Sequence, residues 1–115
     1  MTKKDKELLL KDLCARLPYG VKVQMADGAI EELLNVNVNT FICNGLRGLP
    51  KPYLFPLSSM TEEQKQEFEN ITTIKDGILT VWTTSSYDWL NENHFDYRGL
   101  IKKGLAIDAT GLNIY

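Results

Sequence analysis

The sequence predicts an α+β fold: a small antiparallel β-sheet, made of a meander plus a hairpin, packed against an N-terminal helix and followed by short C-terminal helices. Apolar residues first recur at helical spacing and then alternate with polar ones. Asp-Gly pairs, which favour tight turns, separate strand-like runs. With 43% hydrophobic residues and a formal net charge of −2, residues 1–115 have the composition of one globular domain.

The first segment is predicted to be a helix capped by Thr2, with Asp5 completing a capping box. Its apolar face comprises Leu9, Leu10, Leu13, Cys14 and Leu17. The opposite face, expected to be solvated, comprises Lys6, Lys11, Asp12 and Arg16. Two i,i+4 ion pairs are expected there, Glu7 with Lys11 and Asp12 with Arg16. Pro18 and Gly20 should end the helix.

Three strand-like runs follow and predict the meander. Val21, Val23 and Met25 alternate with polar residues, and Asp27-Gly28 is a turn signal. A second alternating run covers 34–38, and a third covers 41–43. The stretch 45–56 contains three prolines, which remove backbone donors and favour extended geometry before them, so we expect an ordered connection pinned onto the core rather than a free linker.

The second half begins with another capping box, Thr61 with Gln64, which predicts a largely solvated helix to about Asn70. Phe68 and Ile71 are its apolar anchors. The β-branched runs 71–75 and 78–82 then flank an Asp-Gly pair, which predicts a hairpin. A last helical turn followed by a single strand is the competing interpretation.

Two short helices are predicted next. Ser85 or Ser86 would cap one that ends near His94, and Asp96 would cap another over 97–103. Gly104 would supply the left-handed residue that ends it. Residues 105–107 are expected to add a short strand, and 109–115 to form a loose tail.

The chemistry-bearing residues predict no catalytic centre, metal site or cofactor. His94 is the single histidine, and a catalytic role would require a nucleophile and an orienting carboxylate nearby. Nothing in the sequence brings Cys14 or Cys43 close to it, and both cysteines are expected to be small buried hydrophobes. Two cysteines and one histidine are too few for an ordinary structural zinc site.

The aromatic stretch from 82 to 98 is the best candidate for a binding surface. Aromatic side chains together with arginine are typical of protein interfaces. The tentative interface residues are Tyr87, Trp89, His94, Tyr97 and Arg98. The competing interpretation is that most of these rings form the core of a small domain. The predicted helix pair, with Lys102 and Lys103, could instead contact nucleic acid, but the negative net charge disfavours that partner.

The sequence also predicts a cytoplasmic protein without membrane contact. No apolar run approaches the roughly 20 residues of a membrane span. The first residues mix acidic and basic side chains before a short apolar triplet, which is unlike a signal peptide.

The sequence contains the stretches LCARLPYGVKV (13–23), KPYLFPLSSMTEE (51–63), DWLN (88–91), HFDYRGLI (94–101) and KGLA (103–106). Together these stretches resemble a family of short uncharacterised proteins encoded in phages and prophage-like regions of gut bacteria. The resemblance implies a bacterial or phage origin and a compact single domain, but no activity and no site residues. The expected function is therefore a non-enzymatic accessory protein that binds a macromolecular partner, a protein in the first instance. A nucleic-acid-associated factor and a small enzyme centred on His94 are the alternatives.

Overall fold

The computed structural model describes residues 2–25, 28–34, 50–71 and 84–115. Several expectations fall outside the described residues: most of the second predicted strand, the third run at 41–43, Cys43, and the hairpin predicted between 71 and 82.

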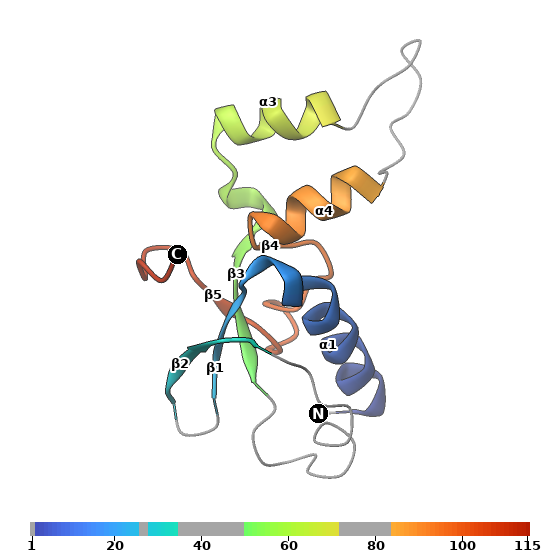
Figure 1. Ribbon diagram of the computed structural model, residues 1–115, viewed down its shortest axis with the longest axis vertical. Coiled ribbons are helices and arrows are strands. Elements are labelled where there is room, and N and C mark those ends of the chain that lie inside the picture. The colour runs from blue at the N-terminus through green and yellow to red at the C-terminus, as the bar shows by residue number, and fades with distance from the viewer. Residues whose placement is uncertain (1, 26–27, 35–49, 72–83) are drawn as a thin grey trace.

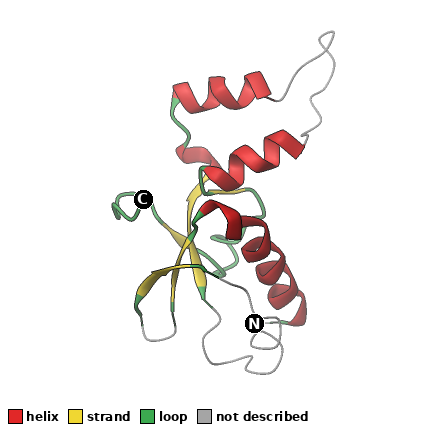
Figure 2. Ribbon diagram, in the orientation of Figure 1, coloured by secondary structure: helices red, strands yellow, loops and turns green. Residues whose placement is uncertain are grey.

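The fold is α+β, as the sequence predicts, but the sheet is mixed rather than antiparallel throughout, with five strands in the order β2-β1-β3-β4 and β5 also pairing with β3. The strands are β1 (Lys22–Gln24), β2 (Ile30–Glu32), β3 (Lys51–Pro56), β4 (Phe95–Asp96) and β5 (Ile107–Asp108). The helices are α1 (Lys3–Arg16), α3 (Glu62–Ile71) and α4 (Thr84–Glu92), with 3₁₀ turns η1 (Leu17–Tyr19) and η2 (Leu57–Ser59). Helix α1 lies beside the sheet, and α3 and α4 lie at one end of it (Figures 1 and 2).

Helix α1 has the predicted cap, with the Thr2 side chain accepting from the Asp5 amide and the Asp5 carboxylate accepting from the Thr2 amide. Leu9 and Leu13 are fully buried. Two expectations for this helix are wrong. Asp12 and Arg16 are 0% exposed rather than solvated, because β4 and the residues after it lie against the helix face that carries them. Cys14 is exposed rather than buried.

Strand β1 lies where the alternation predicts it, with Val21 and Val23 buried. Its antiparallel partner is β2, in the register Lys22↔Glu32. The chain therefore turns back between Met25 and Ala29, and Met25 N donates to Ala29 O at 2.8 Å. Strand β2 lies before the alternating run at 34–38, of which only Leu34 is described, and Leu34 is 78% exposed.

The most important difference from the sequence prediction is β3, a central strand within the stretch expected to be a connection. Its first residues pair antiparallel with β1, its middle pairs parallel with β5, and its end pairs parallel with β4. Each partner strand pairs with only two residues of β3. The backbone N–H groups missing at Pro52 and Pro56 therefore do not interrupt a long run of hydrogen bonds between two strands. Phe55 N, which is available, donates to His94 O at 2.8 Å.

Helix α4 forms close to the predicted position, but the helix predicted over 97–103 is wrong, because these residues form turns. Gly99 has a φ of 72°, which interrupts helical geometry. The Asp96 carboxylate instead accepts from the amides of Leu100 and Ile101 at 2.9 and 3.0 Å. Gly104 takes the expected left-handed conformation, with a φ of 74°.

The C-terminal residues are anchored, contrary to the loose tail expected from the sequence. Ala109 is buried and its amide donates to Leu54 O at 2.8 Å. The Tyr115 hydroxyl donates to Tyr53 O at 2.7 Å and accepts from the Lys22 amide at 2.9 Å. The last residue therefore ties β1 and β3 together.

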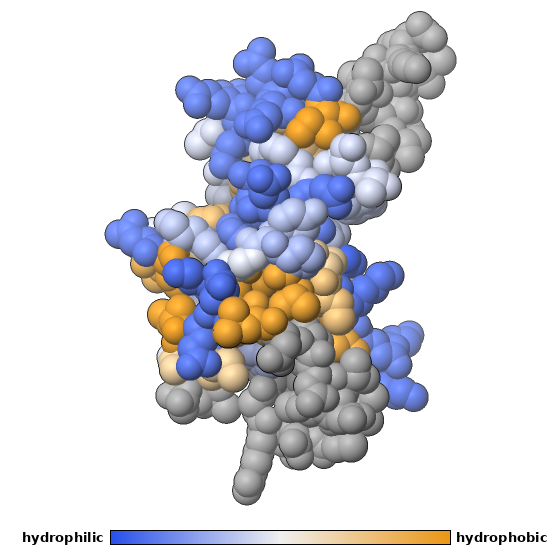
Figure 3. All heavy atoms as spheres, viewed as in Figure 1, coloured by the Kyte–Doolittle hydropathy of each residue, from blue (hydrophilic) through white to orange (hydrophobic). Residues whose placement is uncertain are grey.

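Two apolar clusters hold the described elements. The larger lies between α1 and the sheet and contains Leu9, Leu13, Val21, Val23, Leu33, Leu54, Leu100, Leu105 and Ala106. The smaller centres on Trp89, Leu90 and Phe95, and receives Phe68 and Ile71 from α3 as the sequence predicts. Hydrophilic side chains cover most of α3 on the face seen in Figure 3, whereas apolar residues gather over the sheet. Helix α3 has the predicted capping box of Thr61 and Gln64. It packs on the smaller cluster through few residues, because most of its side chains are hydrophilic.

Candidate functional site

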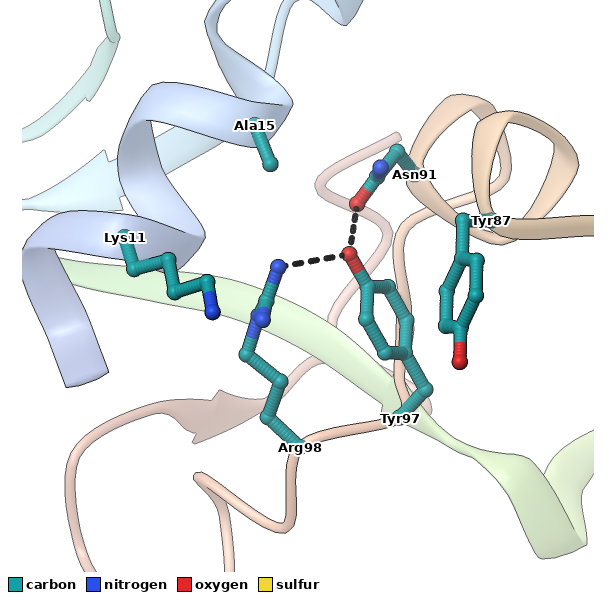
Figure 4. Close-up of a pocket in the computed structure, with 6 residues that line it drawn as sticks. All are labelled: Lys11, Ala15, Tyr87, Asn91, Tyr97 and Arg98. Atoms are coloured by element: carbon teal, nitrogen blue, oxygen red, sulfur yellow. Dashed lines mark hydrogen bonds between the residues drawn. The ribbon is translucent and has the colours of Figure 1, made fainter. Parts of the chain in front are cut away.

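A pocket of about 520 Å³ lies between α1, α4 and the segment that follows β4. Its lining residues are Lys11, Ala15, Tyr87, Asn91, Tyr97 and Arg98 (Figure 4). Three of the five interface residues predicted from the sequence, Tyr87, Tyr97 and Arg98, therefore come together in one place.

The helices contribute two residues each at i,i+4 spacing, which places each pair on one helix face. Lys11 and Ala15 come from α1, and Tyr87 and Asn91 come from α4. The Tyr87 ring lies at 5.3 Å, centroid to centroid, from the ring of Tyr97. Tyr87 nonetheless stays 41% exposed, so the aromatic wall of the pocket faces solvent.

A buried charge network lies behind the pocket. Asp12 Oδ2 accepts from Arg16 Nε at 2.8 Å, and Asp12 Oδ1 accepts from Arg98 Nε at 3.1 Å. Arg16 Nη2 also donates to Phe95 O at 2.6 Å, which joins α1 to β4. Burial raises the pKa of the Asp12 carboxyl above its ordinary value, and the Arg16 guanidinium opposes that rise. One carboxylate thus serves two guanidinium groups.

Arg98 connects this network to the pocket. Its Nη2 donates to the Tyr97 hydroxyl at 3.0 Å, and that hydroxyl donates to Asn91 Oδ1 at 2.9 Å. The guanidinium carbons of Arg98 and Arg16 lie 4.8 and 5.2 Å from the centroid of the Tyr97 ring, which is cation–π geometry. Arg98 has a 17% exposed side chain, so its position is fixed while part of it still faces solvent.

Trp89, another predicted interface residue, belongs to the core instead. It is 6% exposed and its ring stacks on Phe95 at 5.6 Å, with an interplanar angle of 10°. Its Nε1 donates to Glu67 Oε1 at 3.1 Å, which joins α4 to α3. Trp89 is therefore occupied in helix packing and is not presented to a partner.

His94 lies outside the residues that line the pocket. It has a φ of 61° and stacks on Tyr115 with ring centroids 3.8 Å apart. Burial, aided by the positive charge of Arg16, lowers the pKa of His94 to about 4. Its buried Nδ1 has no hydrogen-bond partner among the described residues, and Asp96 spends both carboxylate oxygens on backbone amides. Among the described residues, no carboxylate is hydrogen-bonded to His94 to orient it as a catalytic histidine requires.

Sequence reasoning missed Lys11, Ala15 and Asn91 as pocket residues. Lys11 and Ala15 were assigned to α1 without any signal that residues 97–98 would lie against that helix. The one available signal was charge, because Asp12 and Arg98 are of opposite sign, but many such pairs exist in any sequence.

Among the described residues, no group of three or more His, Cys, Asp or Glu side chains is placed to hold a metal ion. Within the same residues, no helix has the length and apolarity needed to cross a bilayer.

Comparison with protein-family models, with curated proteins and with solved structures finds no match for this chain. Its function must therefore be argued from the pocket itself.

Proposed function

We propose that this protein is a non-enzymatic accessory protein that binds a partner protein through the pocket between α1 and α4. The observation that carries the proposal is the exposed Tyr87 ring beside a fixed Tyr97–Arg98 pair. Tyrosine and arginine are enriched at binding hot spots because they combine a large contact area with polar groups. Following the resemblance to phage- and prophage-encoded proteins, we propose a bacterial cytoplasm as the setting.

The pocket is organised before any partner arrives. Hydrogen bonds run from Asn91 through Tyr97 and Arg98 to Asp12 without interruption. Because these side chains are already ordered, binding would cost little additional side-chain entropy. Such ordering of an exposed aromatic and cationic surface supports recognition.

The two alternative functions receive less support. Nucleic-acid binding by a helix pair needs a recognition helix, and residues 97–103 form turns instead. Catalysis by His94 needs hydrogen-bonded neighbours, and its Nδ1 is buried without one among the described residues.

The proposal is tested by affinity capture from a native host lysate, with and without nuclease, followed by mass spectrometry. The bait proteins are the wild type, Tyr87→Ser, and Leu112→Ser as a matched control, because Leu112 is an exposed apolar residue that does not line the pocket. We expect one partner protein that survives nuclease and is lost only with Tyr87→Ser. A partner retained equally by Tyr87→Ser would contradict the proposal, and recovery that requires nucleic acid would favour the nucleic-acid alternative.

A further inference from the structure

We infer that the pocket recognises a carboxylate, supplied by a Glu or Asp side chain in an acidic segment of the partner protein. This inference rests on the proposed function and specifies the chemistry of its partner. It is carried by the charges and hydrogen-bond donors that face the pocket.

The pocket has an excess of positive charge. Lys11 is exposed and extends from α1 toward the guanidinium of Arg98 (Figure 4). Lys11 has no ion pair among the described residues, and the predicted pair with Glu7 is not formed. Asp12, the carboxylate that accepts from Arg98 Nε, is shared with Arg16. Two cations that line the same pocket repel, and an anion between them would relieve that repulsion.

The available donors match a carboxylate. Arg98 uses Nε for Asp12 and Nη2 for Tyr97, which leaves Nη1 for a ligand within the described part of the molecule. A guanidinium edge and a nearby ammonium bind a carboxylate through charge-assisted hydrogen bonds. The tyrosine rings beside them provide an apolar wall for the carbon atoms of the acidic side chain.

A short acidic segment fits this surface better than a nucleic-acid backbone. The residues that follow Tyr87 and Asn91 on α4 are Asp88 and Glu92, both exposed. These carboxylates would repel a long polyanion, whereas a single carboxylate between Lys11 and Arg98 avoids them. The negative net charge of the whole chain acts in the same direction.

A substitution at Ala15 can place a carboxylate of the protein itself in the pocket. It lines the pocket one helical turn after Lys11, so Ala15→Glu would place a carboxylate there, and Ala15→Gln would add the same volume without charge. Glutamate and glutamine have similar helix propensities, so the two variants should fold alike.

The test is fluorescence anisotropy at low salt with three labelled probes: a dodecapeptide of Gly and Ser with one central Glu, its counterpart with Gln in place of that Glu, and an oligothymidylate of the same length. We expect the wild type to bind the Glu peptide about tenfold more tightly than the Gln peptide. Ala15→Glu and Lys11→Gln should remove most of that preference. Ala15→Gln and Lys102→Gln, the latter a charge loss at an exposed position outside the pocket lining, should keep it.

Three results would overturn the inference: no binding of the Glu peptide, equal binding of the two peptides, or a preference that persists in Ala15→Glu. Tighter binding of the oligothymidylate with the same dependence on Lys11 would assign the pocket to nucleic acid instead. If Tyr87→Ser loses the captured partner while Ala15→Glu retains it, the proposed function stands and the carboxylate inference fails.

Discussion

Replacing Asp12 by asparagine is the sharpest test of the buried network, because it removes one charge and almost no volume. Asp12 and Arg16 are both 0% exposed, and Asp12 accepts from both Arg16 and Arg98. In the variant, Arg16 would stay buried with the Phe95 carbonyl as its remaining strong acceptor. A buried cation without its counterion should therefore dominate the energetics.

Breaking a buried ion pair by removing one partner costs about 3–5 kcal/mol. We expect a value near the lower limit, about 3 kcal/mol, because the asparagine oxygen still accepts one hydrogen bond. For a domain with a total stability of about 5–15 kcal/mol this is a large loss. It corresponds to a decrease of roughly 10 °C or more in Tm for a domain of this size.

Urea denaturation followed by far-UV circular dichroism measures the free energy of unfolding. Glu7→Gln, an exposed carboxylate on the same helix, is the matched control and should change the stability by less than about 0.5 kcal/mol. The double variant Asp12→Asn with Arg16→Met should recover part of the loss, because it removes the uncompensated charge. A loss below about 1 kcal/mol in Asp12→Asn would refute the reasoning.

Three further predictions concern the anchoring of the C-terminal half. The pKa of His94 falls from 6.5 to about 4 on folding, so the unfolded chain takes up the proton first. Lowering the pH through this window should reduce the free energy of unfolding by on the order of 1 kcal/mol, because His94 is only partly buried, as measured by urea titrations of the wild type and His94→Gln. Gly99→Ala should reduce the free energy of unfolding by about 1 kcal/mol, because the φ of Gly99 is 72°, in the left-handed region. Gly99→Asn should reduce it less, because asparagine adopts this conformation more readily, and thermal denaturation measures both variants. Tyr115→Phe should cost about 1 kcal/mol by urea denaturation, because it removes the hydroxyl bonds to β1 and β3.

Each of these predictions has a contradicting result. For His94, it is an identical pH dependence of stability in wild type and variant. Carboxylates titrate in both proteins, so only the difference between the two curves reports the protonation of His94. For Gly99, it is equal stability of the alanine and asparagine variants. For Tyr115, it is an unchanged unfolding curve, which would mean that the hydroxyl is equally well satisfied by water.

Local signals predicted local structure well. The capping boxes at Thr2 and Thr61 predicted where α1 and α3 begin, because a cap depends on residues three apart. The alternation at Val21 and Val23 likewise predicted β1, because it reflects one buried face. The left-handed residue at Gly104 was also predicted correctly.

Features that depend on tertiary partners were not predictable. The prolines of 45–56 predicted an ordered connection, yet β3 forms there because three different partners each pair with a short part of it. Asp12 and Arg16 were assigned to the solvated face, since nothing in the helix pattern shows that β4 will cover them. A capping residue at Asp96 suggested a helix, but its carboxylate stabilises turns because Gly99 is left-handed.

The candidate site was half predicted for the same reason. Tyr87, Tyr97 and Arg98 lie in one aromatic stretch, so composition indicated them. Trp89 lies in the same stretch and packs inward, since residues two apart on a helix point in different directions. Lys11 and Ala15 come from the other end of the chain, and only the fold brings them to the pocket.

The central claim, that this pocket is the binding surface, is tested most directly by site-specific photo-crosslinking in the native host. Benzoylphenylalanine would replace Tyr87 in one bait and Gln66, an exposed residue of α3 outside the pocket lining, in the control. We predict a crosslink from position 87 to an acidic segment of one protein, mapped by mass spectrometry, and none from position 66. Equal crosslinking from both positions, or crosslinks from position 66 alone, would contradict it.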